Sequence, residues 1–308
     1  MQRALAVLWL CAVAGCTSVA APKLHFAAGP ERIVVTADGQ PFAEYRADGP
    51  RGPCVWPLHA PGGQTVTRAF PFAEVEGEAR DHPHHTSLWF AHGAVNGVDC
   101  WAGTGRIVAV GEPTVDAGTG AIRQGCEWRD EAGAVVCRER RELRFAAGGD
   151  WRAVDTLVAL TRADGPLRLG DTKEGTMALR VRSEFCLEGP GAAGRIGNSE
   201  GQVGAAAWGK HARWVAYSAV LDGEEHTVAM FDHPGNHGHP TTWHARGYGL
   251  CAANPFGLHD FTRAPAGTGD LQVPAGSELR LLYRVWLHRG PCDAAAIEAA
   301  WRSFAGGS

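Results

Sequence analysis

The chain has 308 residues, 45% of them hydrophobic and 20% charged, which is the balance of a folded globular protein and excludes a largely disordered chain. The formal net charge is -4, so there is no basic excess, and nucleic acid is not expected as a partner. The 41 glycines and 18 prolines, against 3 methionines, indicate many turns between short strands rather than long helices.

The N-terminal residues 1–21 have the pattern of a lipoprotein signal peptide followed by a short tether. Arg3 carries a positive charge, residues 4–12 form an apolar run too short to span a membrane, and Val-Ala-Gly-Cys ends at Cys16 as a lipobox. We expect Cys16 to be lipidated, which would place the exported protein on a bacterial membrane, at the periplasmic face or the cell surface, through this anchor alone. An ordinary cleaved signal that ends near Ala20 is the alternative.

The cysteines beyond this segment do not form a disulfide framework in the sequence. They are odd in number, widely spaced and without a Cys-x-x-Cys pair, so at most one or two bridges are expected. We expect most of them to be small buried apolar residues. They are Cys54, Cys100, Cys126, Cys137, Cys186, Cys251 and Cys292.

Strand-like segments alternate with turn residues along the rest of the chain, which predicts an all-β fold. We expect a single large antiparallel β-sandwich, similar to a supersandwich, over residues 22–308. The expected strands are residues 32–36, 42–46, 106–110, 121–128, 134–145, 151–161, 177–185, 214–220, 227–231 and 278–288. Residues 49–63, rich in proline and glycine, are expected to be a loop. Only residues 294–304 have helical periodicity, with Asp293 as N-cap, and this short helix should pack against the sandwich.

Two of these strands differ in the quality of their alternation. Residues 136–145 alternate imperfectly between apolar and charged side chains, which indicates a strand with one wet face near an edge. Residues 151–161 alternate more cleanly, which indicates a central strand.

The stretch from Arg80 to Trp101 is the strongest candidate for a functional site. Histidine is readily tuned to act as acid, base or metal ligand near neutral pH, and four histidines lie here among acidic, amide and indole groups. The alternative is a structural loop whose imidazoles cap backbone groups. The residues concerned are His82, His84, His85, Trp89, His92, Asn96 and Asp99.

Three further polar stretches lie between predicted strands, where sandwich proteins often carry their sites. Asp171, Lys173 and Glu174 suit a general acid or base whose pKa is set by its neighbours, or simply an exposed turn. The second stretch joins an indole to amide and charged groups, a set that suits a sugar. It consists of Asn198, Glu200, Trp208 and Lys210. The third stretch contributes His233, His239, His244 and Asn254, and its Asp-His-Pro matches residues 81–83, so we expect both histidine-rich stretches to converge on one pocket.

A divalent metal is a possible cofactor, although the sequence requires none. His82, His84, His85 and His239 are the candidate ligands. In an extended segment, His82 and His84 would share one face and His85 would lie on the other. The sequence contains no His-Glu-x-x-His, cysteine–histidine zinc spacing, serine elbow, phosphate loop or dinucleotide fingerprint.

Several long motifs form a recognisable set: D-H-P-H-H-x-S-L-W-F-A-H-G-x-V-N-G-V-D, G-D-T-K-E-G, F-D-H-P-x-N-x-x-H-P-T-x-W-H and A-A-N-P-F-G. With these motifs, from about Pro53 to Val285, the chain resembles the bacterial family called the PmoA family. That name comes from a methane oxygenase subunit, whereas residues 22–308 have no apolar run near eighteen residues, which a membrane-spanning subunit needs. The resemblance instead implies an exported β-protein of largely unknown function, similar in architecture to galactose mutarotase-like sandwiches that act on carbohydrates.

Together these features predict an enzyme that performs acid–base chemistry on a sugar or keto-sugar, as an epimerase, lyase or hydrolase. His84 or His85 would pair with Glu174 as acid and base, and Lys173 and Asp171 would set their charge. The remaining candidates would bind the substrate: His82, Trp89, His92, Asn96, Asp99, Asn198, Glu200, Trp208, Lys210, His233, His239, His244 and Asn254. The alternatives are a non-catalytic sugar-binding lipoprotein, a metal-dependent enzyme with histidine ligands, and an envelope scaffold with separate, exposed histidine clusters.

Overall fold

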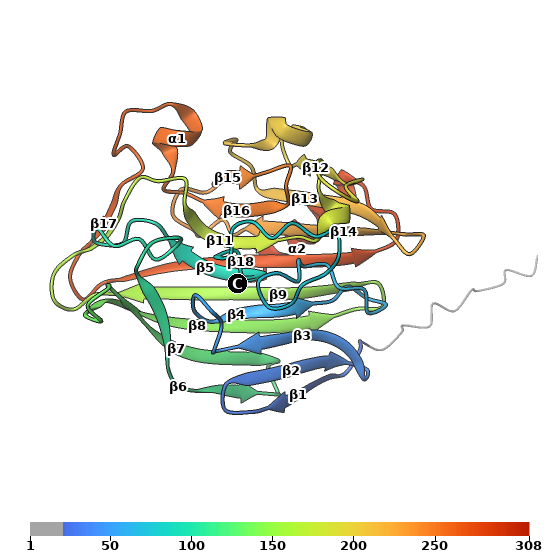
Figure 1. Cartoon of the computed structure of the whole chain (residues 1–308), viewed down its shortest axis with the longest axis horizontal. Coiled ribbons are helices and arrows are strands. Elements are labelled where there is room, and N and C mark those ends of the chain that lie inside the picture. The colour runs from blue at the N-terminus through green and yellow to red at the C-terminus, as the bar shows by residue number, and fades with distance from the viewer. Residues whose placement is uncertain (1–20, 308) are drawn as a thin grey trace, which may run out of the picture.

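The structure, a computed structural model, describes residues 21–307, and β-strands dominate it (Figure 1). Two α-helices and two short 3-10 helices accompany the strands in this part of the chain. The strands are β1 (Leu24–Ala28), β2 (Arg32–Ala37), β3 (Gln40–Arg46), β4 (Cys54–Leu58), β5 (Leu88–His92), β6 (Arg106–Asp116), β7 (Ala121–Arg129), β8 (Val135–Ala147), β9 (Trp151–Thr161), β10 (Leu167–Leu169), β11 (Gly175–Arg180), β12 (Arg195–Asn198), β13 (Trp214–Leu221), β14 (Glu224–Asp232), β15 (Thr242–Ala245), β16 (Leu250–Asn254), β17 (Leu271–Val273) and β18 (Glu278–Arg289). The helices are η1 (Ser183–Phe185), η2 (Gly204–Ala207), α1 (Leu258–Thr262) and α2 (Ala294–Ala305).

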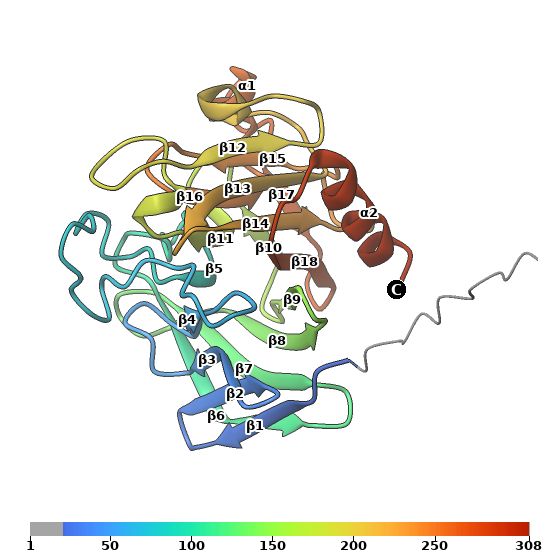
Figure 2. The ribbon, with the colours of Figure 1, turned by 90° about the vertical axis from the view of Figure 1, so that its right-hand side faces the viewer.

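Two eight-stranded sheets pack face to face, as Figures 1 and 2 show. The first sheet has the order β1-β2-β3-β4-β5-β11-β16-β15, and the second has the order β12-β13-β14-β18-β9-β8-β7-β6. β10 and β17 form a small separate pair. Neighbouring strands in both sheets run antiparallel. The predicted all-β antiparallel sandwich is therefore confirmed.

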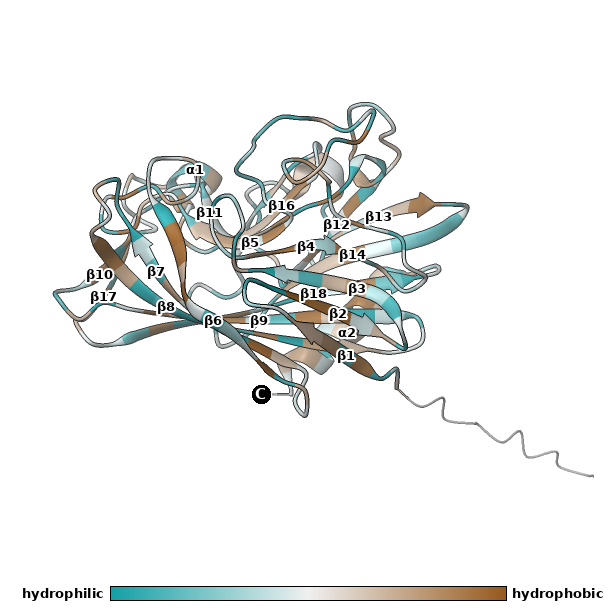
Figure 3. Cartoon of the chain, turned by 60° about the horizontal axis from the view of Figure 1, so that its bottom comes forward, coloured by the Kyte–Doolittle hydropathy of each residue, from teal (hydrophilic) through white to brown (hydrophobic). Residues whose placement is uncertain are grey.

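The facing sides of the two sheets share one apolar core. Phe90 of β5 meets the edge of Trp128 of β7 with ring centroids 6.0 Å apart, and Phe42 of β3 meets Phe145 of β8 at 5.4 Å. Hydrophobic and hydrophilic residues alternate along many strands in Figure 3, as a strand with one buried face requires. The outer faces of the sheets are left free to carry loops, helices and polar groups.

β8 explains the imperfect alternation of residues 136–145. It has one wet face, as predicted, but its buried face also holds the charged side chains of Glu139 and Arg141, which pair with each other. The indole nitrogen of Trp128 donates to Glu139 at 2.7 Å, so the buried carboxylate has a second partner. β8 lies two strands inside the β6 edge, and β9 lies in the middle of the sheet, as its cleaner alternation predicted.

The C-terminal helix α2 packs on the outer face of the second sheet, as predicted. Its N-cap Asp293 accepts a hydrogen bond from the backbone of Ala296 at 2.8 Å. Ile297 and Phe304 join a small apolar cluster with residues of β13, β14 and β18, beside which Figure 2 shows the helix. This cluster is separate from the core between the sheets.

Two local predictions are wrong. Residues 49–63 are not only a loop, because β4 pairs within them, and Pro57 is accommodated where the register to β3 shifts. The strand predicted over residues 177–185 ends at Arg180, and Ser183–Phe185 forms the 3-10 helix η1. β1, β5, α1 and the short strands β10, β12, β15, β16 and β17 were not anticipated.

Residues 1–20, which hold most of the predicted signal peptide and Cys16, lie outside the described part of the chain. Between residues 21 and 307 all seven cysteines are free, and six of them are buried, so the prediction of small buried cysteines is confirmed. No helix in this range is long and apolar enough to cross a membrane.

Candidate functional site

The outer face of the first sheet carries a row of four paired residues. Trp89 of β5 pairs with Ala178 of β11, and Ala178 pairs in turn with Ala252 of β16. Ala252 pairs with His244 of β15. Directly paired residues of antiparallel strands project to the same face, and Phe90 beside Trp89 points into the core. Trp89 and His244 therefore bound a floor of two alanines and are about 14 Å apart by three strand spacings.

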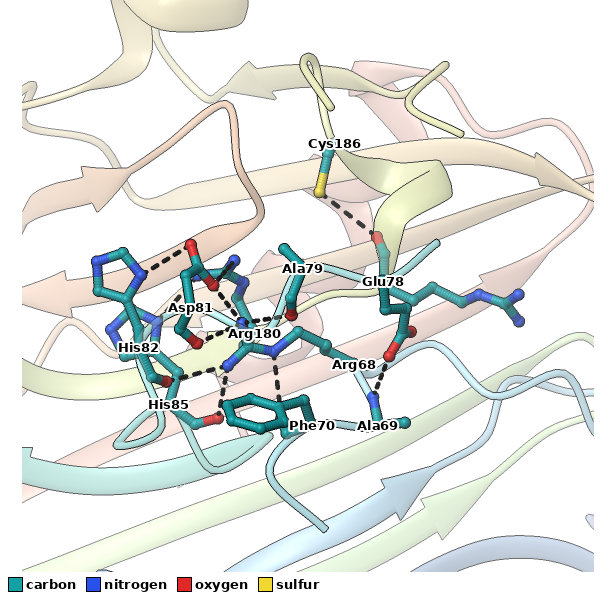
Figure 4. A network of polar contacts seen from close by, with 11 residues as sticks. Arg68, Ala69, Phe70, Glu78, Ala79, Asp81, His82, His85, Arg180 and Cys186 are labelled. Atoms are coloured by element: carbon teal, nitrogen blue, oxygen red, sulfur yellow. Dashed lines mark hydrogen bonds and ion pairs between the residues drawn. The ribbon is translucent and has the colours of Figure 1, made fainter. Parts of the chain in front are cut away.

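A loop of residues 69–87 lies over this face and is folded around the guanidinium of Arg68 (Figure 4). The Arg68 side chain is buried and donates hydrogen bonds of 3.0–3.3 Å to four backbone carbonyl groups of the loop. It also forms an ion pair with the carboxylate of Asp81 at 2.5 Å. Because guanidinium has five donors in a rigid plane, one side chain holds both ends of the loop together. The four carbonyl acceptors belong to Phe70, Ala79, Asp81 and His82.

The three histidines of this loop pack against one another. The rings of His82 and His85 stack with centroids 4.7 Å apart, and His84 meets the edge of His85 at 4.5 Å. The condition under which His82 and His84 would share one face, an extended segment, is therefore not met. His82 has a positive φ of 43°, and the backbone N–H of His85 donates to the carbonyl of His82, so the segment turns instead of extending.

His85 is buried and fixed by Arg180, which ends β11. The Arg180 Nη1 atom donates to His85 Nδ1 at 3.1 Å. Since arginine only donates, Nδ1 carries no proton, and the proton of neutral His85 is on Nε2. Burial, followed by the nearby charges of His84 and Arg180, holds the pKa of His85 far below its ordinary value. The His85 ring stacks on His82 and also on Trp89, the latter with ring centroids 5.2 Å apart, so these contacts fix its position above the sheet.

His84 is only half-buried and is the accessible histidine of the loop. Burial, followed by the charge of His82, lowers its pKa to about 4, while the carboxylates of Glu174 and Asp99 act in the opposite direction. His84 is thus neutral near pH 7 and within electrostatic range of Glu174, a residue ninety positions away in the sequence. A neutral imidazole beside a carboxylate is able to accept or relay a proton.

Glu174 precedes β11 and acts on a second histidine, His244. The ammonium of Lys173 donates to the Glu174 carboxylate at 2.5 Å, and this hydrogen bond is the main reason why the pKa of Lys173 is raised. His244 Nδ1 lies 3.1 Å from the carbonyl oxygen of Lys173, so Nδ1 carries the proton and Nε2 is the free nitrogen. Burial lowers the pKa of His244 to about 4, and the charge of Glu174 opposes this shift.

Half-buried aromatic rings frame the same face. Tyr248 stacks on His82 at 5.2 Å with an interplanar angle of 10°, and the Arg180 guanidinium lies 4.6 Å from its ring centre. At the other end of the alanine floor, Trp208 meets the edge of His244 at 6.4 Å. Aromatic faces beside polar donors and acceptors suit the C–H face and hydroxyls of a sugar ring.

Two predicted site residues hold the loop that carries Glu174. Asn254 is fully buried on β16, and its side-chain amide donates to the carbonyl of Thr172 at 2.9 Å. Asp171 accepts hydrogen bonds from the backbone N–H groups of His259 and Gly269, both at 3.0 Å. Asp171 therefore fixes the α1 segment, and both of its carboxylate oxygens already have partners.

Three other candidates near the histidine loop make structural contacts. His92 is completely buried, with Nε2 2.9 Å from the carbonyl oxygen of Gly170. Asn96 donates to the carbonyl of Pro166 at 3.0 Å and has a positive φ of 49° in a tight turn. Asp99 accepts two backbone hydrogen bonds in the following turn, although its charge also acts on His84.

The stretch that begins at Asn198 belongs to the turn after β12. The side-chain oxygen of Asn198 accepts hydrogen bonds from two backbone N–H groups of that turn, one of them from Glu200. Glu200 forms an ion pair with Arg213 at 3.0 Å, and Lys210 is exposed. In this stretch, Trp208 is the member that contacts His244.

His233 and His239 lie on the second sheet, away from the histidine loop. His239 Nδ1 is 2.7 Å from the carboxylate of Asp232, and its ring stacks on Trp301 of α2 at 6.2 Å. His244 and the loop of residues 69–87 thus lie at the same face of the first sheet, whereas His233 and His239 do not. The reason is topological: the chain leaves β14 of the second sheet at Asp232 and enters β15 of the first sheet ten residues later.

The same separation keeps the predicted metal ligands apart. His239 lies against α2 at the second sheet, whereas His82, His84 and His85 lie in the loop over the first sheet. Within residues 21–307, no group of three or more histidine, cysteine, aspartate or glutamate side chains lies close enough together to hold a metal ion.

A hollow of about 480 Å³ lies on the outer face of the second sheet, and His233 is one of the residues that line it. Its charged groups satisfy one another: Arg284 donates to both carboxylate oxygens of Asp155, at 2.5 and 2.8 Å, and lies over the ring of Phe304. We take the first sheet as the candidate site because neutral histidines and a carboxylate from distant segments meet there.

Sequence reasoning missed Arg68, Arg180 and Tyr248. A charged residue at the end of the apolar segment Met177–Leu179 marks Arg180 in retrospect, because such a residue is buried only with partners. Tyr248 is one of only four tyrosines, which is a weak signal. Nothing in the local sequence distinguishes Arg68 from the other arginines.

Comparison with solved structures finds remote likenesses. A galactose mutarotase-like protein from Lactobacillus casei has 7% identity and a TM-score of 0.35, over 86% of this chain and 100% of that one. The α-galactosidase AgaB from Geobacillus stearothermophilus has 11% identity and a TM-score of 0.38, over 87% of this chain and 41% of that one. For a putative aldose 1-epimerase from Escherichia coli, the identity is 12% and the TM-score 0.30, over 87% and 99% of the two chains.

Comparison by sequence gives a family. No curated protein matches the chain. The model of a family of unknown function, DUF6807, matches residues 32–302, which include both sheets from β2 to β18 and every residue of the candidate site. The chain belongs to this family of unknown function, DUF6807.

Proposed function

We propose that the chain is an exported carbohydrate-active enzyme in which His84 and Glu174 act as an acid–base pair on a sugar. One observation carries the proposal: the Lys173–Glu174 segment faces side chains from three separate segments. The carbonyl oxygen of Lys173 is 3.1 Å from His244 Nδ1, and Glu174 lies within electrostatic range of His84 and Tyr248. A surface loop that served only to cap backbone groups would not need to bring these side chains together. The arrangement puts one carboxylate within electrostatic range of two neutral imidazoles, which are groups that can exchange protons with a substrate.

His84 is preferred to His85 as the catalytic histidine. His85 is buried, and Arg180 occupies its Nδ1 atom, so His85 holds the stack of rings in place. His84 is half-exposed and neutral near pH 7, which is the state of a base that is ready to accept a proton. Lys173 keeps a positive charge next to Glu174 and orients its carboxylate.

The sugar would contact the half-buried groups above the row of Trp89, Ala178, Ala252 and His244, because Ala178 and Ala252 themselves are fully buried. Tyr248 and Trp208 are half-buried and offer aromatic faces to a sugar ring. Epimerisation, β-elimination and hydrolysis each require one proton to be removed and another delivered. A carboxylate within electrostatic range of two neutral histidines suits all three reactions, and the substrate panel below separates them.

The test uses two substitutions at the pair, His84→Asn and Glu174→Gln, with His25→Asn as control on the exposed edge strand β1. Turnover is followed by NMR on a panel of oligosaccharides and keto-sugars, and affinity is measured by calorimetry. Removal of a general acid or base lowers kcat by about 10²- to 10⁴-fold, with affinity nearly unchanged. His25→Asn leaves both quantities unchanged. If the wild-type protein binds sugars but turns over none of the panel, it is a non-catalytic binding lipoprotein and the enzyme proposal is lost.

A further inference from the structure

A cavity of about 160 Å³ adjoins the histidine loop and is lined by two buried arginines. Arg68 and Arg180 are 2% and 1% exposed, so both guanidinium groups are almost fully removed from water. Tyr248 also lines the cavity and stacks on His82, which connects the cavity to the candidate site. Buried charges need partners, so the balance of charge around this cavity is informative.

The two arginines share a single carboxylate. Oδ1 of Asp81 accepts from Arg68 at 2.5 Å and from Arg180 at 2.8 Å, while Oδ2 is 2.8 Å from His82. Burial, followed by the positive charge of Arg180, lowers the pKa of Arg68 to about 10. The nearest further acids are Glu78, whose carboxylate accepts from a backbone N–H, and Glu188 at the rim. Asp81 and Glu78 therefore balance the two arginines in charge, and what distinguishes the cavity is the state of the guanidinium hydrogen-bond donors.

Arg180 also has a donor without a partner. Its Nη1 atom donates to His85 and its Nη2 atom to Asp81, but Nε is buried and has no hydrogen-bond partner among the described residues. An unsatisfied buried donor is costly, and in native proteins it often marks a group that a ligand completes. The Arg68 donors, in contrast, are taken by carbonyl groups of the loop.

We propose that this cavity is a subsite for the carboxylate of an acidic sugar, with Arg180 Nε as its main donor. The inference rests on the proposed function, since it names a uronic acid as the class of substrate. A carboxylate group fits the cavity volume, and the ring that bears it would lie against Tyr248 and His82. Glu188 at the rim is exposed, so solvent screens its repulsion, and the unpaired Arg180 Nε supplies the favourable contact.

The first experiment compares ligands on the wild-type protein and needs no substitution. Calorimetry with glucuronate, galacturonate, their C6 amides and the neutral parent sugars separates charge from shape. A charge-assisted contact predicts that each acid binds at least about tenfold more tightly than its amide. Equal affinity for acid and amide, or no binding of either acid, overturns the inference. Acetate and glucose 6-sulfate are two further ligands in this comparison. Acetate should compete only weakly with the uronates, because it has no sugar ring. If glucose 6-sulfate binds more tightly than the uronates, the subsite is specific for a sulfate group and the carboxylate assignment is wrong.

The second experiment compares Arg180→Lys with Arg182→Lys. Arg182 lies two residues along, is half-buried and is paired with Glu184, so its substitution controls for the loss of a nearby guanidinium. Arg180→Lys should reduce the preference for acid over amide to about twofold or less without loss of neutral-sugar affinity, and Arg182→Lys should preserve it. If Arg180→Lys retains the full preference, Arg180 Nε is not the donor. Should that variant not fold, the acid and amide comparison on the wild type decides alone.

The two proposals fail in different ways. If His84→Asn abolishes turnover while acid and amide remain equivalent, only the carboxylate subsite is wrong. If the acids bind selectively but neither His84→Asn nor Glu174→Gln affects turnover, only the acid–base pair is wrong.

Discussion

Neighbouring histidines in this protein differ in their ability to exchange a proton, because they differ in burial and in hydrogen-bond partners. His84 is half-buried and free to exchange a proton, whereas His85 is locked by Arg180 and stacked on Trp89. His92 is fully buried and hydrogen-bonded to a backbone carbonyl. A residue type therefore identifies the chemistry that is available, and burial with a specific partner decides whether it is used.

Buried histidines should make stability depend on pH. Burial lowers the pKa of His92 and of His244 from 6.5 to about 4, so the unfolded chain takes up protons first as the pH falls. The contribution of these two histidines to the free energy of unfolding is complete above about pH 6.5. It is lost progressively down to about pH 4, by at most about 1.4 kcal/mol per pH unit for each histidine. Urea unfolding at pH 7, 5.5 and 4.5 measures this loss. His92→Gln keeps a donor to Gly170 and should flatten the pH dependence; an unchanged slope would contradict it.

Among the structural elements, the loop of residues 69–87 shows how one side chain orders a long segment. Four backbone carbonyl groups of the loop accept from Arg68, and Asp81 pairs with both Arg68 and Arg180. The loop has no regular hydrogen-bonded ladder of its own, so these contacts replace one. The positions of His82, His84 and His85 consequently depend on a residue outside the loop.

Arg68→Lys should loosen this loop. A single ammonium cannot reach all of the carbonyl acceptors of the loop, and its contact with the carboxylate of Asp81 is weaker than that of the guanidinium. The free energy of unfolding should therefore fall by about 3 kcal/mol. Limited proteolysis should cut between residues 70 and 85. Arg80→Lys is the matched control, because Arg80 lies in the same loop but is exposed and paired with Glu74, and it should change stability by less than about 0.5 kcal/mol. Equal protease resistance of Arg68→Lys and the wild type would rule out this role of Arg68.

At the scale of the whole molecule, the two sheets have outer faces of different character. The first carries the neutral histidines, Glu174 and the aromatic rim, while α2 covers part of the second. The seven free cysteines between residues 21 and 307 show that core packing holds this sandwich without disulfide bonds. We propose that a lipid on Cys16 attaches the protein to a membrane.

Lipidation at Cys16 is tested by Cys16→Ser in the full-length protein. The wild type should incorporate radiolabelled palmitate in a bacterial host and partition into detergent, because acyl chains supply the hydrophobic anchor. Cys16→Ser should lose the label and remain in the aqueous phase with the fold intact by circular dichroism. Label retained by Cys16→Ser would show that the anchor lies elsewhere.

The sequence by itself determined the secondary structure where periodicity is strong. β7, β8, β9, β13, β18 and α2 were predicted nearly to the residue, because alternation and caps are local signals. The sequence did not reveal short strands such as β15 and β16, which are buried on both faces and therefore show no alternation of apolar and polar residues.

Only the tertiary structure decided which polar side chains share a face. β11 lies between β5 and β16, which are more than one hundred and fifty residues apart in the chain. This pairing puts His244 on the same face as Trp89, on which the loop residue His85 stacks. His233 and His239, which are closer to His244 in sequence, go to the other sheet with β14. Strand pairing is non-local, so spacing along the chain does not reveal it. The buried arginines were hidden for the same reason, since their partners come from distant loops.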